Sequence, residues 1–578
     1  MSTLIPIGSD YLPPTLQRFA QAAVQRDTNG IVDLLVLPIT YASDSQEIPE
    51  SERTENMTLA DERRVQIEDA CNAVKQAKQS CRVVLAPVLT HPDALLQSNL
   101  DLFVKDLDGM YILGGDQTIA MQVVANTPFE ERMAAAFKQG AVVGGNSAGA
   151  AVQSRSMING YVGDFGPENG FQKGIVDLWL YEGPSDATRG LSFGIKNAIF
   201  EQHTFQRGRI ARLLNASFSS RLLGIGLDAE TGAIVTNESM LTDVTGTTAA
   251  VVVDLQSYAA SGRFAGPTSS LSLHKVATHL IPPGNFGYDL QQRRPLVNGK
   301  GLPAPNISKR NFNALRVPSG YGPLLLGGDL SADRAGAVTQ RFVTVSGGKK
   351  AQLVVLTLGY AKSSDAQAEA KAWATALQGV KSVQWFVLDA KVDQNAVKKA
   401  IASASGVLIT APDQSLVLDA LNGANSAITA LRNGWAQGKA VLADNAVAAA
   451  LGATLTLDPP STEDSLETDA MGDFLADGVT VQPGLKWLPG VAIEPRMVLE
   501  RHWGRLYSQL AHTSTLLGLG VDVNTALEIT TTGASVVGSN TVVVLDGRLS
   551  SFATGTNGAL SALYVMLDSY VQGDTVLP

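Results

Sequence analysis

The chain has 578 residues, of which 45% are hydrophobic and 17% are charged, and its net charge is −10 at pH 7. This composition is typical of a globular protein that is too long for a single hydrophobic core, so we expect two or more domains. The mild acidic excess argues against a nucleic-acid partner, and no apolar stretch is long enough to predict a membrane span.

The two cysteines, Cys71 and Cys81, have a spacing that suits neither a zinc site nor a disulfide framework. We expect them to be reduced thiols in a cytoplasmic protein. Residues 1–14 lack the basic region and apolar run of a signal peptide, which also favours a cytoplasmic location, although a trimmed leader would leave no trace. No metal site is visible, and no cofactor is expected.

Short apolar runs recur along the first third of the chain, at residues 31–39, 82–89, 110–115 and 141–145. Helical patterns such as residues 60–79 lie between them. Buried apolar strands that alternate with helices predict the α/β class, with a mostly parallel sheet covered on both faces. Ligands bind such sheets at the carboxyl ends of the strands, where Gly-rich segments follow two of these runs.

The segment "GGNSAGAAVQ", residues 144–153, places Ser147 where a strand meets a helix. One interpretation is a nucleophile on a sharp turn, with the N–H of Ala148 facing an oxyanion. The other is a tightly packed turn, in which Gly149 allows close backbone approach. The second Gly-rich end, "LGGDQTIA", would complete the oxyanion site with a backbone N–H of Gly115 and begin the next helix at Asp116 and Gln117, and Gln117 would hold a substrate amide or carboxylate.

A serine nucleophile needs a base, and His203 is the histidine with a distinctive setting. It follows the apolar run "AIF" and precedes Arg207, Arg209 and Arg212, which we expect on the first turns of a helix. Cations at that end oppose the helix dipole, so an anionic ligand explains them better than a solvated basic face does. The orienting acid is Asp228 or Glu230 in "GIGLDAETGAIV"; the order Ser, His, acid differs from that of the α/β-hydrolases.

Four blocks of the sequence recur in the same order in the second half of the chain. For example, "LLGLGVDVNTALEI" near residue 516 echoes "LLGIGLDAETGAIV" near residue 222, and "GKAVLADNAVAAAL" near 438 echoes "GAVVGGNSAGAAV". The chain therefore resembles two copies of one α/β domain. We predict a catalytic domain over 1–300, a linker rich in Pro, Gly and Asn over 301–320, and a second domain over 321–578.

The second copy lacks the candidate catalytic residues. Ser147 corresponds to Ala446, or to Asn445 if the gap moves by one residue, His203 to Arg496, and Glu230 to Asn524. Arg207 and Arg209 correspond to Glu500 and His502, Arg212 to Arg505, and the glycines 114 and 115 to Ala411 and Pro412. The apolar strand pattern is kept, so the second copy is predicted to be a catalytically inactive domain.

Taken together, "GGDQ", "GGNSAGA", "EQHTFQRGRIARLL" and "GIGLDAETGAIV" resemble the cyanophycinases, whose peptidase family also contains aspartyl dipeptidases. The resemblance covers residues 1 to about 300. It implies a class I glutamine amidotransferase-like, flavodoxin-like fold for each of two tandem domains, and a Ser147–His203–Glu230 triad. The implied substrate site comprises Asp116, Gln117, Glu201, Gln202, Arg207, Arg209 and Arg212. Glu201 departs from the Asp found in cyanophycinases, and the loop over about 159–190 is long for the family.

The resemblance implies a serine exopeptidase that hydrolyses cyanophycin, a polyaspartate with arginine on each side-chain carboxyl, to β-Asp-Arg dipeptides. Ser147 would form the acyl-enzyme, and Glu230 would orient His203. The alternatives are an aspartyl or isoaspartyl dipeptidase acting on β-aspartyl peptides, and a non-catalytic polymer-binding protein. Because simple cyanophycinases are dimers of one domain, the second copy would form an intramolecular pseudo-dimer or would bind the polymer.

Overall fold

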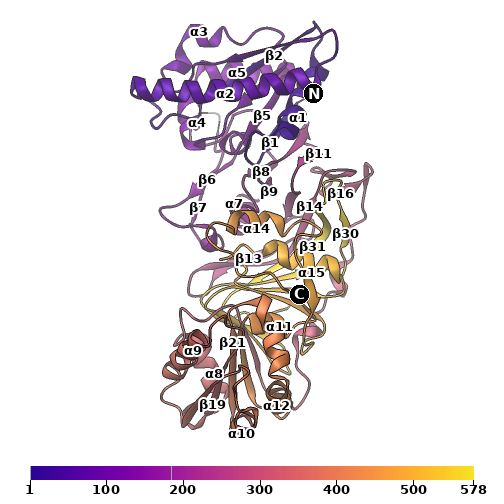
Figure 1. The fold of residues 1–578 in the computed structure, drawn as a ribbon. Coiled ribbons are helices and arrows are strands. Elements are labelled where there is room, and N and C mark those ends of the chain that lie inside the picture. Colours follow the sequence, from indigo (N-terminus) through magenta and orange to yellow (C-terminus); the bar gives the residue numbers. More distant parts are fainter. Residues whose placement is uncertain (1, 184, 578) are drawn as a thin grey trace.

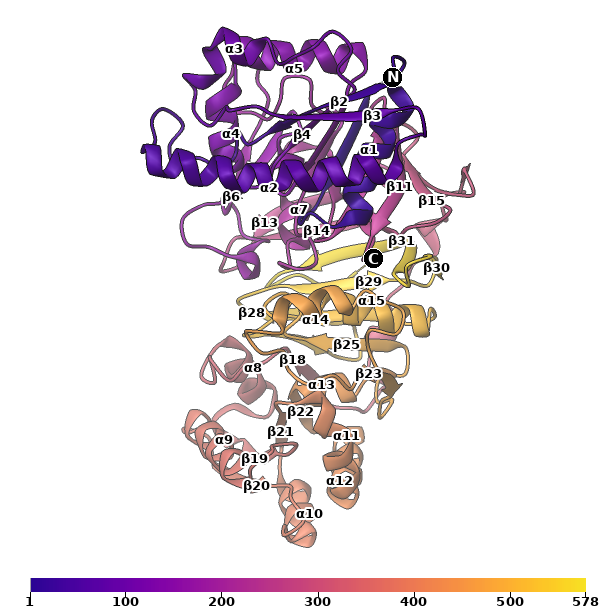
Figure 2. The same cartoon turned by 45° about the horizontal axis from the view of Figure 1, so that its top comes forward.

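The computed structural model describes residues 2–183 and 185–577, and three large β-sheets follow one another along an elongated molecule (Figures 1 and 2). The sheets have 10, 12 and 7 strands, and a separate two-stranded sheet is formed by β6 (Met157–Tyr161) and β7 (Val176–Trp179). Within the described ranges, no helix combines the length and the apolar character needed to cross a membrane.

The first sheet has a parallel core that confirms the predicted α/β class. Helices α1 (Pro13–Arg26) and α2 (Glu50–Val74) cover one face, and α5 (Pro128–Gln139) contributes Phe129 to the core on the other. The inner strands are largely apolar because neither face meets water, whereas the edge strand of the core is partly exposed. In order across the sheet, the core strands are β1 (Thr3–Ile7), β5 (Val142–Asn146), β4 (Gly109–Ile112), β2 (Ile31–Leu37) and β3 (Ser80–Leu85).

The strand order of this core recurs in the 7-stranded sheet of the second half. In both sheets, an antiparallel pair of strands flanks the parallel core on the same side, namely β10 (Thr231–Thr236) and β11 (Met240–Gly246) in the first half and β27 (Thr525–Ile529) and β28 (Ala534–Gly538) in the second. The second core consists of β18 (Leu324–Gly327), β22 (Ala440–Asn445), β21 (Gly406–Ala411), β19 (Gln352–Thr357) and β20 (Ser382–Val387).

The central 12-stranded sheet is shared by the two halves, which the prediction of two tandem domains did not foresee. Strand β14 (Ser270–Ile281) of the first half pairs antiparallel with β31 (Leu560–Tyr570) of the second. On either side the order is the same: β12 (Ala250–Asp254), β9 (Leu223–Gly226) and β8 (Ala198–Glu201) beyond β14, and β29 (Val542–Asp546), β26 (Leu517–Val521) and β25 (Val491–Pro495) beyond β31. Main-chain hydrogen bonds therefore join the halves.

The segment predicted as a linker, 301–320, packs against the second half. Arg310 is 8% exposed, and its guanidinium forms ion pairs with Asp546, at 3.0 Å, and with Asp568. Both carboxylates are almost completely buried. A buried charge is tolerated only when it is paired, so this connection is part of the core and not a free tether.

The expectation of two reduced thiols is wrong, because Cys71 on α2 and Cys81 on β3 form a disulfide. Their Cα atoms lie 6.2 Å apart, since α2 packs directly against β3 at this point. Disulfides are typical of oxidising compartments. The bond therefore argues against the cytoplasmic location, which stays a prediction.

Replacement of Arg310 by Met should lower the free energy of unfolding by about 3–5 kcal/mol, because two buried carboxylates would lose their shared partner. Arg263→Met is the matched control: Arg263 is 62% exposed in its side chain and pairs with Asp574, and its loss should cost about 0–1 kcal/mol. Urea unfolding of both variants measures the difference. Equal effects would contradict the buried linker.

Candidate active site

Ser147 lies on a sharp turn between β5 and the short helix α6 (Ala148–Ala151). Its backbone angles, φ 52° and ψ −116°, are unusual for a residue with a side chain, and its N–H donates to the carbonyl of Ile7 at 2.9 Å. Backbone strain of this kind costs on the order of 1–3 kcal/mol and is concentrated at functional sites. The geometry is that of a nucleophile elbow, which presents the hydroxyl at the end of the strand.

Two glycines allow this turn to approach its neighbours. A side chain at Gly149 would collide with the carbonyl of Ile112, so α6 can pack on β4 only with glycine there. A Cβ atom at Gly114 would lie 3.3 Å from the Cβ of Ser147, which places the "GGDQ" turn beside the nucleophile. The N–H of Ala148 begins α6 and so has no partner within that helix. Ala148 follows Ser147 directly and Gly115 follows Gly114, and the oxyanion role of both stays a prediction.

His203 is in contact with Ser147, as the sequence predicts. The Oγ of Ser147 lies 3.0 Å from the Nε2 of His203, which follows β8 in the central sheet and is 7% exposed. Burial, and secondarily the positive charge of Arg207, lowers the pKa of His203 to about 3. The imidazole is therefore neutral at pH 7 and can accept the serine proton.

The Nδ1 atom of His203 meets the side-chain oxygen of Gln206, a residue that the sequence analysis did not single out. A donated Nδ1–H leaves the Nε2 lone pair free to face Ser147. Glu230 lies in the turn before β10, at φ 56°, and its N–H donates to the carbonyl of Ser9 at 3.3 Å. Among the described residues, neither a hydrogen bond nor an ion pair joins its carboxylate to His203, so the structure does not form the predicted triad contact.

Asp228, the other acid left open by the sequence, has a different task. It is fully buried, and one carboxylate oxygen accepts the N–H groups of Phe205 and Gln206, each at 2.9 Å. Burial raises its pKa to about 7, against the lowering effect of these hydrogen bonds. Asp228 therefore fixes the backbone that carries Gln206 to the imidazole.

Two of the predicted substrate residues shape the rim of the site. Asp116 caps α4 (Gln117–Val124), accepting from the N–H groups of Thr118 and Ile119 at 2.6 and 3.2 Å. The amide of Gln117 donates to the carbonyl of Asn159 on β6. Gln117 thus anchors β6, where the long segment over 159–190 begins, beside the "GGDQ" turn.

The three arginines do not form the expected row on a helix. Helix α7 (Ile210–Ser220) begins after Arg207 and Arg209, so only Arg212 lies within it. Arg212 donates two hydrogen bonds to Glu201, at 2.7 and 2.6 Å, and its guanidinium lies over the ring of Tyr161. Both partners are almost completely buried. The Glu201–Arg212 pair therefore satisfies itself, which corrects the expectation that all three arginines face an anionic ligand.

The other two arginines differ in exposure. Arg209 donates to the main-chain carbonyl of Gln202 at 3.0 Å and also to its side-chain oxygen; burial, together with Arg212, lowers its pKa to about 9, so it stays charged at neutral pH. The side chain of Arg207 is 44% exposed and lies 3.7 Å from the carboxylate of Glu467 in the second half. Of the three, Arg207 is the guanidinium most open to a ligand.

The second half keeps the backbone of the site without its chemistry. Asn445 has φ 53° and ψ −128°, almost the angles of Ser147, so it is the counterpart of Ser147 rather than Ala446. Arg496 and Asn524 likewise share the positive φ of His203 and Glu230. Arg496 forms ion pairs with Asp329, at 3.5 Å, and with Glu500. This arrangement holds no nucleophile and base.

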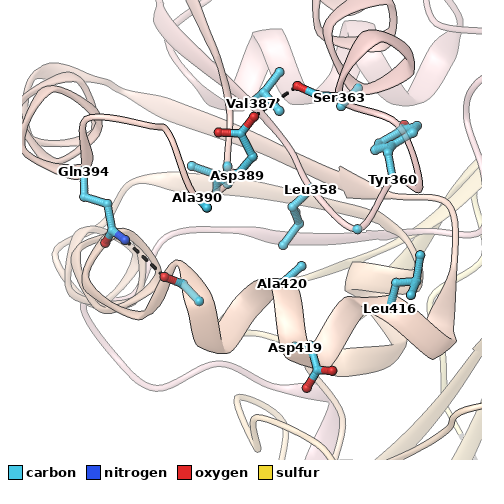
Figure 3. A pocket seen from close by; sticks show the side chains of 14 residues that line it. Leu358, Tyr360, Ser363, Val387, Asp389, Ala390, Gln394, Leu416, Asp419 and Ala420 are labelled. Atoms are coloured by element: carbon cyan, nitrogen blue, oxygen red, sulfur yellow. Dashed lines mark hydrogen bonds between the residues drawn. The ribbon is translucent and has the colours of Figure 1, made fainter.

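A cavity of about 490 Å³ opens in the second half, at the carboxyl ends of β19 and β20 (Figure 3). Ser363 in its wall donates to Asp389 at 3.0 Å, and Asp419 points from α11 (Gln414–Gly423) on the other side. None of the described residues that line it is a histidine, so Ser363 has no base there. The cavity does not compete with Ser147 as a peptidase site.

Comparison with known proteins shows what the chain resembles. Residues 66–169 match peptidase family S51. The chain is 32% identical over 199 residues to a cyanophycinase of Geminocystis herdmanii, covering 34% of this chain and 67% of that protein. It is 29% identical over 202 residues to a cyanophycinase of a Nostoc strain, covering 34% of this chain and 62% of that protein. Among solved structures, a peptidase from an acI-B1 actinobacterium aligns at 19% identity and a TM-score of 0.30, covering 44% of this chain and 90% of that one.

The chain therefore belongs to peptidase family S51 and is a serine-type peptidase. The elbow at Ser147 and the neutral imidazole of His203 have the geometry of a serine nucleophile and its base, and their catalytic roles stay a prediction. The matched part spans about two thirds of the first relative and 62% of the second.

Replacement of Gln206 by Ala should slow acylation of Ser147 about 100-fold, because an imidazole that loses its orienting contact moves out of line with the hydroxyl. The rate of covalent inactivation by a fluorophosphonate, which reacts with activated serines, measures this step without a peptide substrate. Glu230→Gln is the comparison variant. A larger loss in Glu230→Gln than in Gln206→Ala would return the orienting role to Glu230.

The inactivation rate should stay level as the pH falls through 6.5, the ordinary pKa of histidine, and decline only towards pH 4 and below. A lowered pKa keeps the imidazole neutral to lower pH, so the acidic limb of the pH–rate profile shifts to lower pH. Replacing Arg207 by Met removes one cause of the shift and should move the limb upward. A limb centred near pH 6.5 in the parent protein would contradict a buried, unprotonated His203.

Proposed function

We propose that the protein is an exopeptidase that hydrolyses cyanophycin to β-Asp-Arg dipeptides through an acyl-enzyme on Ser147. The single observation that carries the proposal is the 3.0 Å contact between Ser147 and His203 in a chain whose curated relatives are cyanophycinases. The second half is proposed to be catalytically inactive and to act as the built-in partner of a pseudo-dimer.

The chemistry follows from the positions of the groups. The Oγ of Ser147 attacks the aspartyl carbonyl while the Nε2 of His203 takes its proton. The negative oxygen of the tetrahedral intermediate accepts from the N–H groups of Ala148 and Gly115. His203 then protonates the leaving amine, the acyl-enzyme forms, and a water activated by the same imidazole releases the product and restores Ser147.

The charges near the site suit a zwitterionic polymer. Arg207 offers an exposed guanidinium that can pair with a substrate carboxylate. The chain as a whole carries a net charge of −10, which favours approach of a substrate rich in guanidinium groups. Glu201 and Arg212 form a buried ion pair with each other, so the proposal assigns neither of them a direct contact with substrate.

Incubation of the full chain with insoluble cyanophycin, followed by mass spectrometry of the soluble products, should reveal β-Asp-Arg dipeptide. Ser147→Ala should abolish its release. The proposed substrate would be overturned if the parent protein cleaved short aspartyl or isoaspartyl dipeptides and left the polymer intact. Unchanged release of β-Asp-Arg by Ser147→Ala would overturn the proposed nucleophile.

A further inference from the structure

The segment that carries the catalytic histidine, residues 203–209 and called here the histidine loop, packs against the second half of the chain. The rings of Phe205 and Phe474 stack with centroids 3.7 Å apart, and both residues are buried. Phe474 follows α14 (Leu466–Gly472), which Figure 1 shows beside α7. The second half therefore contacts Phe205, which lies one residue before Gln206 and two residues after His203.

The peptide groups of Gln206 are held from both sides. Its N–H donates to the buried carboxylate of Asp228 in the first half, at 2.9 Å. Its carbonyl accepts from the Nη1 of Arg501 in the second half, at 2.6 Å. The side chain of the same residue meets the Nδ1 of His203. Arg501 thus reaches the residue that orients the catalytic base.

The backbone conformation at Arg501 is one that disfavours a residue with a side chain. Its φ of 59° matches the 61° of Gly208, its counterpart in the repeat, and glycine is the residue that this conformation prefers. The aliphatic part of Arg501 fills the space in which a side chain on Gly208 would stand. The two counterparts therefore meet where the halves join, and the longer one points into the first half.

The positive charge of Arg501 lies near a carboxylate at the contact between the two halves. Glu467 on α14 lies 3.8 Å from Arg501 and 3.7 Å from Arg207, so one carboxylate of the second half lies near a guanidinium from each half. The side chain of Arg501 is only 16% exposed. Burial lowers its pKa, and Glu467 opposes that shift. The guanidinium donor makes the hydrogen bond to Gln206 charge-assisted.

We propose that Arg501 is a positioning residue of the active site, so that the catalytically inactive half completes the catalytic one. It fixes the carbonyl of Gln206, which fixes the amide against Nδ1 of His203 and selects the tautomer that can take the proton of Ser147. The role of Arg501 in substrate turnover rests on the proposed function, whereas its effect on Ser147 does not depend on which peptide is cleaved. The second half is thus more than a polymer-binding appendage.

The test uses the full chain with Arg501→Gly, which removes the guanidinium and installs the residue that the backbone favours. The second-order rate of inactivation by a fluorophosphonate should fall about 10–100-fold, as expected when a catalytic group is displaced. Arg501→Lys keeps a charged donor and should recover part of the rate. Arg263→Met, which breaks an ion pair with Asp574 between the halves away from the site, should react at the parental rate.

Two further readouts separate positioning from folding. With a cleavable peptide substrate, Arg501→Gly should lower kcat more than it raises KM, and the acidic limb of its pH profile should move, because the imidazole has lost its fixed partner. Its thermal midpoint should stay within the range of Arg263→Met. Parental inactivation rates in both Arg501→Gly and Arg501→Lys would overturn the proposal, as would an equal loss in Arg263→Met. Rapid labelling of Ser147 in a parent protein that leaves cyanophycin intact would instead overturn only the proposed substrate.

Discussion

The antiparallel pairing of β14 with β31 is the constraint on which the rest of the molecule depends. It merges the sheets of two similar halves into one sheet of 12 strands and fixes their separation and angle through main-chain hydrogen bonds. His203 and its counterpart Arg496 both follow strands of this shared sheet, whereas Ser147 comes from the first sheet. The Ser147–His203 contact is therefore assembled between two sheets, and the second half approaches the histidine loop as a consequence of the same pairing.

Burial governs the electrostatics around that pair. Three arginines near a histidine make it a weaker base, because their positive charges disfavour the imidazolium that forms when it takes a proton. Here Glu201 neutralises Arg212, Gln202 binds Arg209, and Glu467 lies beside Arg207. The imidazole stays neutral, and Asp228 and Arg501 hold the backbone beside it. Each buried charge thus has a partner, as the cost of burial requires.

Much of the core and the central contact of the site could be predicted from the sequence. Apolar runs predicted the parallel strands, a Gly-rich strand end predicted the turn at Ser147, and the arginines beside His203 marked it as the base. The two side chains meet at 3.0 Å. The repeat predicted the counterparts, and the shared positive φ of Asn445, Arg496 and Asn524 agrees with that alignment.

The remaining contacts depend on geometry that no local pattern encodes. Glu201 and Arg212 are separated by a turn and by part of a helix, and only the packing of α7 on the sheet brings them together. Gln206 lies in the same block as His203, but its contact with the imidazole follows from the turn that Asp228 imposes. The repeat predicts two copies but not which sheet edges pair. Neither the contact between Arg501 and Gln206 nor the shared sheet could therefore be predicted from the sequence. The same holds for the disulfide, since helical and strand positions 71 and 81 face each other only after α2 packs on β3.

The central claim is that a single serine, Ser147, is activated in a chain that carries two similar turns. Intact-mass analysis after saturation with a fluorophosphonate, followed by peptide mapping, tests it most directly. The account predicts one adduct per chain, located on Ser147 and absent from Ser147→Ala and from His203→Ala. An unmodified parent protein, or an adduct on a serine of the second half, would contradict it.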